Sequence, residues 1–402
     1  MDPLDDGSLG TPGAEDDRKE VLASIDRETP EILALAHWMS AHPELSLEER
    51  ETSKRYVAYL AARDFKLSRG SAEMETAFVA EYGLPEASFS IALLAEMDAL
   101  PEIGHACGHN LSGPASLLAA AALAKWLDPK LLRIVVVGCP AEETGVGKPK
   151  LVAAGVFDGM DAAMMAHASD MRRAHRLFLG NRKYEFVYRG KAAHAAAYPE
   201  QGINALDGVI SLFVAIGLLR QQLPSDIRVH GIISDGGKAP NIIPERAAAK
   251  VWVRGLDPEA LDEAEARVIA CAKGAAETSG TQLEIISSAG CSPPMKANLP
   301  LASAYRRNLD FLGLAETNHS PSQAIGSSDI THISRVVPTI HPNFPIGESL
   351  ALHTRAFSDA AASERGDAGL LEGARAMALT VVDLVNSETL RQEVAAADRT
   401  QG

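Results

Sequence analysis

The sequence has little cysteine and no excess of positive charge. Only four of its 402 residues are cysteine, and they lie far apart at positions 107, 139, 271 and 291. Such spacing excludes a disulfide framework and favours a reducing compartment, so we expect a cytoplasmic protein. The formal net charge of −15 argues against nucleic acid or an anionic membrane surface as the main partner.

Long hydrophobic runs are also absent. No stretch of 18 consecutive apolar residues occurs, so we expect no membrane-spanning helix. The first residues, MDPLDDGSLGTPGAEDD, are acidic and rich in Gly and Pro, which predicts a flexible tail over residues 1–17 rather than a secretory signal. Hydrophobic residues make up 46% of the chain, a proportion typical of globular proteins, and 402 residues predict more than one domain.

Buried strands alternate with helices in the first half of the chain. A helical pattern begins near Arg18, and the short apolar run Ile91–Ala95 predicts a strand buried in a parallel sheet. RIVVVGCP and DAAMMAHAS predict two further strands, separated by the helical stretches SGPASLLAAAALAKWL and KPKLVAAGVF. This βαβαβ order predicts an α/β domain with a parallel-rich sheet and helices on both faces.

The pattern changes from about Asn181. Four alternating segments predict strands and two amphipathic segments predict helices, in the order β-α-β-β-α-β of a ferredoxin-like α+β domain. Residues of the kind found in catalytic sites occur again after this stretch. We therefore predict a catalytic domain in two parts, residues 18–179 and 290–402, interrupted by an inserted domain at residues 180–289.

Side chains that can bind a metal ion follow the first buried strand. Asp98 comes directly after that strand, and Cys107 and His109 follow in the segment HACGH. Ligands of open α/β sheets bind at the carboxyl ends of the strands. A thiolate and an imidazole two residues apart can reach one divalent ion, and Gly108 between them permits a tight turn. An ordinary loop with these residue types is the alternative interpretation.

Two adjacent glutamates follow the second predicted strand. Glu142 and Glu143 lie in PAEETG, and neighbouring side chains of an extended segment point to opposite sides. One carboxylate can therefore bind a metal ion while the other faces the substrate as a general base. Two solvated glutamates at a strand end would look the same in the sequence.

Two further histidines extend this pattern. His167 ends the third predicted strand, and His353 lies far along the chain, beyond the inserted domain. Each alone is more typical of a structural histidine, but three consecutive strands that end in possible ligands at one sheet edge favour a metal site. Two nearby ions with one bridging ligand would suit the set Cys107, His109, Glu143, His167 and His353.

Eight segments together resemble a known enzyme family. They are HPELSLEE, MDALPEIGHACGHN, PAEETGVGK, MAHAS, RGKAAHAAAYPEQGINALD, GGKAPNIIPERA, SSDITHIS and LHT, and they span residues 42 to 354 in family order. The chain resembles the dinuclear metallo-amidohydrolases of the metallopeptidase type, which include aminoacylases and auxin-conjugate amidohydrolases. It is most similar to the branch that holds the aminobenzoyl-glutamate hydrolases and the β-alanyl-lysine dipeptidases.

The resemblance implies a role for each matching residue. The five residues of the set above match the metal ligands, Glu142 matches the general base, and Asp98 matches an acidic residue that supports the metal site. His194 matches a histidine that stabilises the oxyanion, and in this family it reaches the active site of the partner subunit. Asn241 matches a residue of the lid that contacts the substrate. The inserted domain is then both a lid and a dimerisation domain.

The resemblance also implies an activity. We expect a hydrolase that cleaves the amide bond of a small N-acyl amino acid or a dipeptide-like substrate through a metal-bridged water, with Glu142 as general base. Two divalent ions per subunit, Zn²⁺ or Mn²⁺, and a homodimer are expected with it. A non-catalytic metal- or ligand-binding protein of the same fold is the alternative.

The chain departs from the family pattern at two places. Asn110 stands where many relatives carry Asp, although the aminobenzoyl-glutamate and β-alanyl-lysine branch shares the Asn. Thr331 and His332 stand where that branch has Gly and an acidic or amide residue, which indicates an unusual substrate. Arg254 can either bind a substrate carboxylate or hold a strand end.

Overall fold

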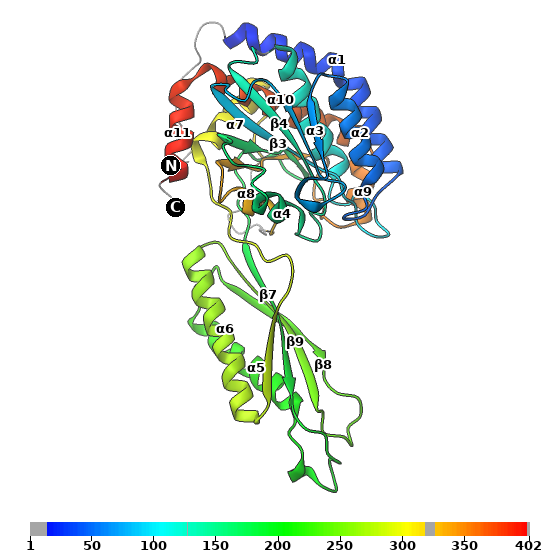
Figure 1. Ribbon diagram of the computed structural model, residues 1–402, viewed down its shortest axis with the longest axis vertical. Coiled ribbons are helices and arrows are strands. Elements are labelled where there is room, and N and C mark those ends of the chain that lie inside the picture. The colour runs from blue at the N-terminus through cyan, green and yellow to red at the C-terminus, as the bar shows by residue number, and fades with distance from the viewer. Residues whose placement is uncertain (1–13, 127, 318–325, 400–402) are drawn as a thin grey trace. The chain divides into compact units, whose positions relative to one another are not determined.

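The computed structural model describes residues 14–126, 128–317 and 326–399. These residues fall into two compact units (Figure 1): one comprises those within Met1–Arg176, Lys296–Ala324 and His332–Gly402, and the other those within Leu177–Met295 and Ile325–Thr331. Residues 1–13 of the expected tail lie outside the described residues. The other four belong to helix α1 (Ala14–Ala41), which begins earlier than the pattern indicates.

The first unit is built on a six-stranded sheet with the strand order β1-β2-β4-β3-β5-β11. Strands β4, β3, β5 and β11 run parallel, while β1 and β2 form an antiparallel edge that the sequence patterns did not reveal. Every residue of β3 is buried, as expected for an interior strand of a parallel sheet. The strands are β1 (Lys66–Arg69), β2 (Phe78–Tyr82), β3 (Phe89–Glu96), β4 (Leu132–Cys139), β5 (Ala162–Met164) and β11 (Thr339–Ile340).

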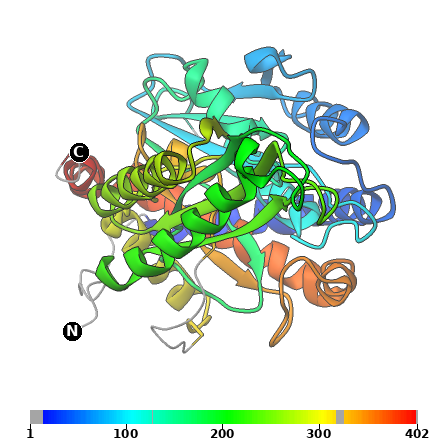
Figure 2. The same ribbon diagram turned by 90° about the horizontal axis from the view of Figure 1, so that it is seen from below.

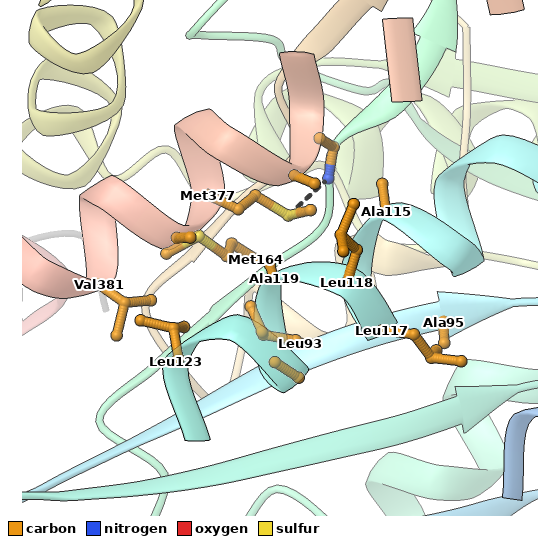
Figure 3. Close-up of a cluster of buried hydrophobic side chains, with 14 of the residues drawn as sticks. Leu93, Ala95, Ala115, Leu117, Leu118, Ala119, Leu123, Met164, Met377 and Val381 are labelled. Carbon is orange, nitrogen blue, oxygen red and sulfur yellow. Dashed lines mark hydrogen bonds between the residues drawn. The ribbon is translucent and has the colours of Figure 1, made fainter. Parts of the chain in front are cut away.

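Helix α3 is the buried central helix of the first unit. This helix packs on β3 and β4, and α1 and α10 pack against it. It is apolar on all sides, which is the pattern of a helix buried in a core (Figure 3). The helices are α1, α2 (Arg50–Ala61), α3 (His109–Trp126), α4 (Gly147–Ala153), α7 (Leu299–Phe311), α9 (Arg355–Ala361), α10 (Glu364–Asn386) and α11 (Glu388–Arg399). A short helix, α8 (Ile330–Ile333), lies at the boundary of the two units in the chain.

A glycine permits the close approach of α3 to β3. A Cβ atom at Gly113 would lie 2.3 Å from the carbonyl oxygen of Glu96 and 2.2 Å from the hydroxyl of Tyr56. Only a residue without a side chain fits between them. The amino end of α3, where His109 is the first helical residue, therefore lies beside the carboxyl end of β3.

The prediction of one strand over DAAMMAHAS is wrong, because this segment forms two. Strand β5 joins the main sheet, whereas β6 (His167–Ser169) pairs in parallel with β12 (Asn343–Pro345) in a separate two-stranded sheet. Between them, the backbone N–H of Ala166 donates to the sulfur of Met377 at 3.2 Å (Figure 3). The partner strand comes from more than 170 residues further along the chain, so local patterning cannot reveal this break.

The second unit is an antiparallel sheet with the order β10-β7-β9-β8, and the connection β-α-β-β-α-β confirms the predicted ferredoxin-like insertion. Helices α5 and α6 lie side by side (Figure 2). Side chains of Asn204 and Asp257 cap their amino ends. The elements are β7 (Gly180–Arg189), α5 (Ala205–Leu219), β8 (Arg228–Asp235), β9 (Arg246–Gly255), α6 (Pro258–Ser279) and β10 (Gln282–Ser287). The α/β class with an inserted antiparallel domain is thus confirmed.

Helix α5 is apolar on more than its buried face. With the turn that follows it, Ala205–Gln222 is the one described segment long and apolar enough to cross a membrane, and 33% of it is buried. Length and composition alone also fit a packed helix, and α5 does pack on β7, β9 and α6. Its other face exposes Ile210, Val214 and Leu218, which are 48%, 59% and 71% exposed. These three residues, spaced by four, form an apolar stripe along the helix.

Candidate metal centre

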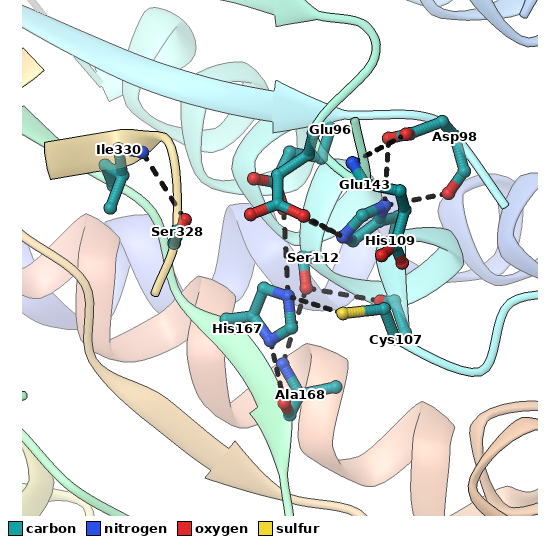
Figure 4. A network of polar contacts seen from close by, with 12 residues as sticks. Glu96, Asp98, Cys107, His109, Ser112, Glu143, His167, Ala168, Ser328 and Ile330 are labelled. Atoms are coloured by element: carbon teal, nitrogen blue, oxygen red, sulfur yellow. Dashed lines mark hydrogen bonds and ion pairs between the residues drawn. The ribbon is translucent and has the colours of Figure 1, made fainter. Parts of the chain in front are cut away.

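The HACGH segment lies against β6 in the first unit. Gly108 has a φ of +85°, and a Cβ atom there would lie 2.5 Å from the Cβ of Ala168. Glycine therefore both makes the turn and lets the loop touch the strand. As a result the sulfur of Cys107 lies 3.8 Å from Nε2 of His167, although 60 residues separate them (Figure 4).

His353 joins this group from the far end of the chain. Its backbone N–H donates to the carbonyl of Ala106 at 2.9 Å, and its φ of +62° is a left-handed conformation that is costly for a non-glycine residue. Its Nε2 lies 3.4 Å from Oε2 of Glu143. The surrounding structure thus holds this imidazole beside the carboxylate that follows β4.

The distances fit shared metal ions. Nitrogen, oxygen and sulfur ligands lie 2.0–2.3 Å from a zinc ion, so two ligands of one ion are separated by about 3.3–3.8 Å. The ligand atoms of Cys107, His109 and His167 lie within 4.8 Å of one another, as do those of Cys107, His109, Glu142 and Glu143. The structure therefore brings together all five expected ligands and the expected base.

Unsatisfied polar atoms support the same conclusion. Nε2 of His109 and Oε1 of Glu143 are buried and make no hydrogen bond to any described part of the chain. A buried polar atom without a partner costs about 1–3 kcal/mol. Imidazole nitrogen, thiolate and carboxylate are ligands that Zn²⁺, Mn²⁺ and Co²⁺ accept, so the residues present fit divalent ions well.

Asp98 orients two of these ligands. Its carbonyl oxygen lies 2.7 Å from Nδ1 of His109, which leaves Nε2 of that ring to face the centre. Its Oδ2 accepts hydrogen bonds from the hydroxyl of Ser46 at 2.7 Å and from the backbone N–H of Glu143 at 3.0 Å. Burial raises the pKa of this carboxyl, but the hydrogen bonds from His109 and Ser46 outweigh burial and lower the pKa to about 2.

The protonation of the ligands depends on burial. Burial lowers the pKa of His167 to about 4, so its imidazole is neutral at neutral pH, which is the form that binds metals. Burial raises the pKa of the Cys107 thiol. A divalent cation supplies the positive charge that stabilises the thiolate in such a place.

The loop after β4 is held by a residue that sequence reasoning missed. Buried Glu49 accepts hydrogen bonds from the backbone N–H groups of Ala141 at 2.9 Å and Leu47 at 2.9 Å, and from the hydroxyl of Thr76. Ala141 has a φ of +58°, so the turn before Glu142 is strained. Glu49 ends the segment HPELSLEE, but nothing in that local pattern points to a role in supporting the loop.

The two residues expected to contact substrate lie together in the second unit. The backbone N–H of Ala195 donates to the carbonyl of Asn241 at 3.0 Å, so the loops that carry His194 and Asn241 are joined. Nδ1 of His194 accepts from the backbone N–H groups of Ala196 and Ala197 at 3.3 and 3.2 Å. Because Nδ1 is an acceptor, a proton of this exposed ring lies on Nε2.

Most of the other residues noted in the sequence have structural contacts. Asn110 donates to the hydroxyl of Ser40 and the carbonyl of Ala361, and the guanidinium of Arg254 lies over the ring of Trp252 at 5.1 Å. The structure also places buried His341 here, with its ring stacked on that of His167 and the centroids 5.1 Å apart. His332 lies in α8.

Comparison with known proteins agrees with this architecture. Residues 179–279 match the peptidase dimerisation domain of the M20 family. The chain is 33% identical to the Xaa-Arg dipeptidase of Mus musculus, over 98% of this chain and 94% of that protein. It is 31% identical to a subunit of the p-aminobenzoyl-glutamate hydrolase of Escherichia coli (strain K12), over 73% of this chain and 65% of that one.

A solved structure shows the same fold. A dinuclear metal-binding peptidase of the M20 family from Bacillus subtilis superposes with a TM-score of 0.70, over 90% of this chain and 99% of that one, at 21% identity. Together with the nearly full-length similarity to the mouse dipeptidase, this confirms the resemblance inferred from the eight segments. The chain belongs to the M20 peptidase family, whose members are metal-dependent hydrolases of dipeptides and N-acyl amino acids.

Proposed function

We propose that this chain is a dipeptidase that hydrolyses the amide bond before a basic carboxy-terminal residue. The observation that carries the proposal is the convergence of Cys107, His109, Glu143, His167 and His353 on one site of the first unit. The similarity to the mouse Xaa-Arg dipeptidase over 98% of the chain supports the substrate class. The net charge of −15 favours the approach of a basic substrate.

Two divalent ions would be held by these five residues. When bound, such ions polarise the scissile carbonyl and lower the pKa of a water molecule. Asp98 keeps the ring of His109 in the orientation in which Nε2 faces the centre, and it holds the backbone of Glu143. These contacts position the ligands before any substrate arrives.

Glu142 is the general base in this proposal. Its side chain is 12% exposed, and its Oε2 lies 3.9 Å from Nε2 of His109. The carboxylate takes a proton from the attacking water as the C–O bond forms at the amide carbon. It then passes this proton to the amide nitrogen as the C–N bond breaks, so the products are a carboxylic acid and an amine.

His194 donates to the oxyanion from a partner subunit in this proposal. Its Nε2 proton and its exposure suit a donor that meets a negatively charged oxygen outside its own unit. A homodimer formed by the second unit supplies that arrangement. The match of residues 179–279 to a dimerisation domain supports the homodimer.

Two apolar surfaces of the second unit suit a dimer. One is the stripe of Ile210, Val214 and Leu218 on α5. The other lies along β8, which pairs only with β9 among the described strands and exposes Ile232 and Ile233 by 63% and 48%. An apolar strand at the edge of a sheet is usually covered by another chain or by a helix.

The test is turnover of a substrate panel after loading with Zn²⁺, Mn²⁺ or Co²⁺. The panel contains dipeptides that end in Arg or Lys, the same dipeptides ending in Ala or Glu, and N-acetyl and N-benzoyl amino acids. Higher kcat/KM for the basic dipeptides supports the proposal. Preference for N-acyl amino acids would overturn the substrate class, and metal binding without any turnover would favour a binding protein.

We also propose a reducing compartment such as the cytoplasm. A cysteine ligand is open to oxidation, which would remove it from the site. Localisation of a tagged chain by microscopy or fractionation tests this proposal, and recovery from an oxidising compartment would contradict it.

A further inference from the structure

Glu96 lies beside the metal centre, yet its two carboxylate oxygens have different surroundings. It is the last residue of β3 and is completely buried. Oε1 accepts a hydrogen bond from Nζ of Lys148 at 2.6 Å. Oε2 lies 3.4 Å from Nε2 of His109 and 3.8 Å from Nε2 of His167 (Figure 4). Oε2 makes no hydrogen bond to the described residues.

The contacts of the two imidazoles show which of their nitrogen atoms can bind a cation beside Glu96. Nδ1 of His109 lies 2.7 Å from the carbonyl oxygen of Asp98, and Nδ1 of His167 lies 2.8 Å from that of Ala168. A carbonyl oxygen only accepts, so each Nδ1 carries a proton, and Nε2 is the nitrogen through which each ring can bind an ion. Oε2 of Glu96 therefore faces the two nitrogen atoms through which these rings can bind an ion, and its negative charge suits a cation held among the three atoms.

The distances also separate metal binding from hydrogen bonding. At 3.4 and 3.8 Å, the contacts of Oε2 are longer than the usual 2.7–3.2 Å of an N–H···O hydrogen bond. The 3.4 Å contact agrees with the separation of about 3.3–3.5 Å between nitrogen and oxygen atoms bound to one ion, and the 3.8 Å contact is a few tenths of an ångström longer. The unpartnered oxygen is thus placed where a ligand would be.

We propose that Oε2 of Glu96 is a further ligand of the metal centre, in addition to the five residues expected from the family pattern. This inference rests on the proposed metal-dependent function. Lys148 in α4 is also completely buried, and its ammonium group occupies Oε1. The carboxylate can then bind an ion through one oxygen only, and Lys148 offsets the negative charge that Glu96 adds.

A carboxylate ligand has a consequence for the choice of metal. Carboxylate oxygen is harder than thiolate or imidazole and favours Mn²⁺ more than a site made only of sulfur and nitrogen would. An added ligand also raises the coordination number above four. Cobalt reports this directly, because four-coordinate Co²⁺ absorbs visible light much more strongly than five- or six-coordinate Co²⁺.

The experiment compares wild type with Glu96→Gln, Lys148→Met and the double variant. Each protein is stripped of metal and titrated with Mn²⁺ and Co²⁺, and affinity, stoichiometry and the Co²⁺ spectrum are measured. We expect Glu96→Gln to weaken the binding of at least one ion by more than about 10–100-fold, since that is already the cost of removing a group that only contacts a ligand. We expect its Co²⁺ absorption to strengthen, since a ligand is lost.

The double variant separates the two roles of Glu96. Glu96→Gln alone leaves Lys148 charged beside the centre, and this charge would weaken cation binding even if Glu96 were no ligand. If Glu96 is a ligand, the double variant still binds weakly and keeps the altered spectrum, whereas Lys148→Met retains both ions. Recovery of wild-type affinity and spectrum in the double variant would overturn the proposal.

A crystal structure of the metal-loaded wild type gives a measurement that needs no variant. Oε2 about 2.0–2.2 Å from an ion supports the proposal, and Oε2 beyond bonding distance of both ions overturns it.

The proposed function and the Glu96 proposal are contradicted by different results. A wild type that binds no divalent ion at all contradicts the proposed function, whereas a wild type with two ions and turnover, matched by Glu96→Gln in affinity and spectrum, contradicts this inference alone.

Discussion

The two units carry their candidate functional residues in opposite settings. In the first unit, Glu96, Asp98 and His109 are buried and held by several contacts. In the second unit, His194 and Asn241 are exposed on loops. The first unit gathers buried groups that can bind a cation, while the second presents exposed polar groups on its loops.

The difference has a physical basis. Parallel strands deliver side chains from their carboxyl ends into one buried place, where positions are fixed by packing. The described antiparallel strands of the second unit leave β8 at an edge, and α5 keeps an apolar stripe exposed. An exposed edge and stripe are features of a surface that meets another chain.

The substitution with the largest expected effect is Glu142→Gln, in the first unit. Removal of the general base should lower kcat by up to about 10⁴-fold, while KM changes little. Metal content should remain at the wild-type level, because the five ligands are intact. Steady-state kinetics and metal analysis of the same preparation check both points. A variant with wild-type kcat would contradict the role of Glu142 as the base.

His194→Ala tests the second region and should lower kcat by about 10²–10³-fold, the usual cost of losing one oxyanion donor. Metal affinity and unfolding temperature should not change.

A mixture of His194→Ala and Glu142→Gln subunits then shows in which subunit's site the histidine acts. If it acts in the partner's site, random dimers regain about a quarter of wild-type activity, since half are mixed and each has one complete site. No recovery would place the action of His194 within its own subunit.

The stability of the metal-free protein should depend on pH, because the first unit contains buried histidines. The folded pKa of His167 is about 4, below its ordinary 6.5, so unfolding takes up a proton between these values. The stability from this group is complete above pH 6.5 and falls as pH drops to 4, by about 3 kcal/mol. His105, which has a pKa of about 3, and His341 act in the same direction.

Chemical denaturation of metal-free protein from pH 7 to pH 4 measures this loss. The His167→Ala variant should lose less stability over the same range. Its unfolding takes up about one proton fewer, so its free energy of unfolding falls less steeply with falling pH. Equal slopes for wild type and His167→Ala would contradict the effect of burial.

Val214→Glu should give the smallest change, a weaker dimer. A carboxylate in the stripe on α5 must be desolvated at the interface, and we expect dimer dissociation to increase by about 10-fold or more. Analytical ultracentrifugation over a concentration series measures this constant. Ala395→Glu adds the same charge to exposed α11 of the first unit and should leave it unchanged. A dimer equally stable in both variants would place the interface elsewhere.

The sequence anticipated much of the fold and of the candidate site. Strands β3 and β4 have short apolar runs, and the alternation of the inserted segment gave the order of all its elements. The set of ligands could be predicted because each ligand lies in a segment that matches the family. Glu49 and Lys148 were missed as partners because each acts through a contact with a residue 52 or more positions away.

The sequence alone determined the class of fold, the inserted domain and the residue types able to bind two divalent ions. These depend on local periodicity and on short segments, which one-dimensional order contains. Only the tertiary structure decided that β6 leaves the main sheet for β12, that His353 lies beside Glu143, and that Oε2 of Glu96 faces Nε2 of two imidazoles. These contacts join distant parts of the chain, and packing of the buried core selects them.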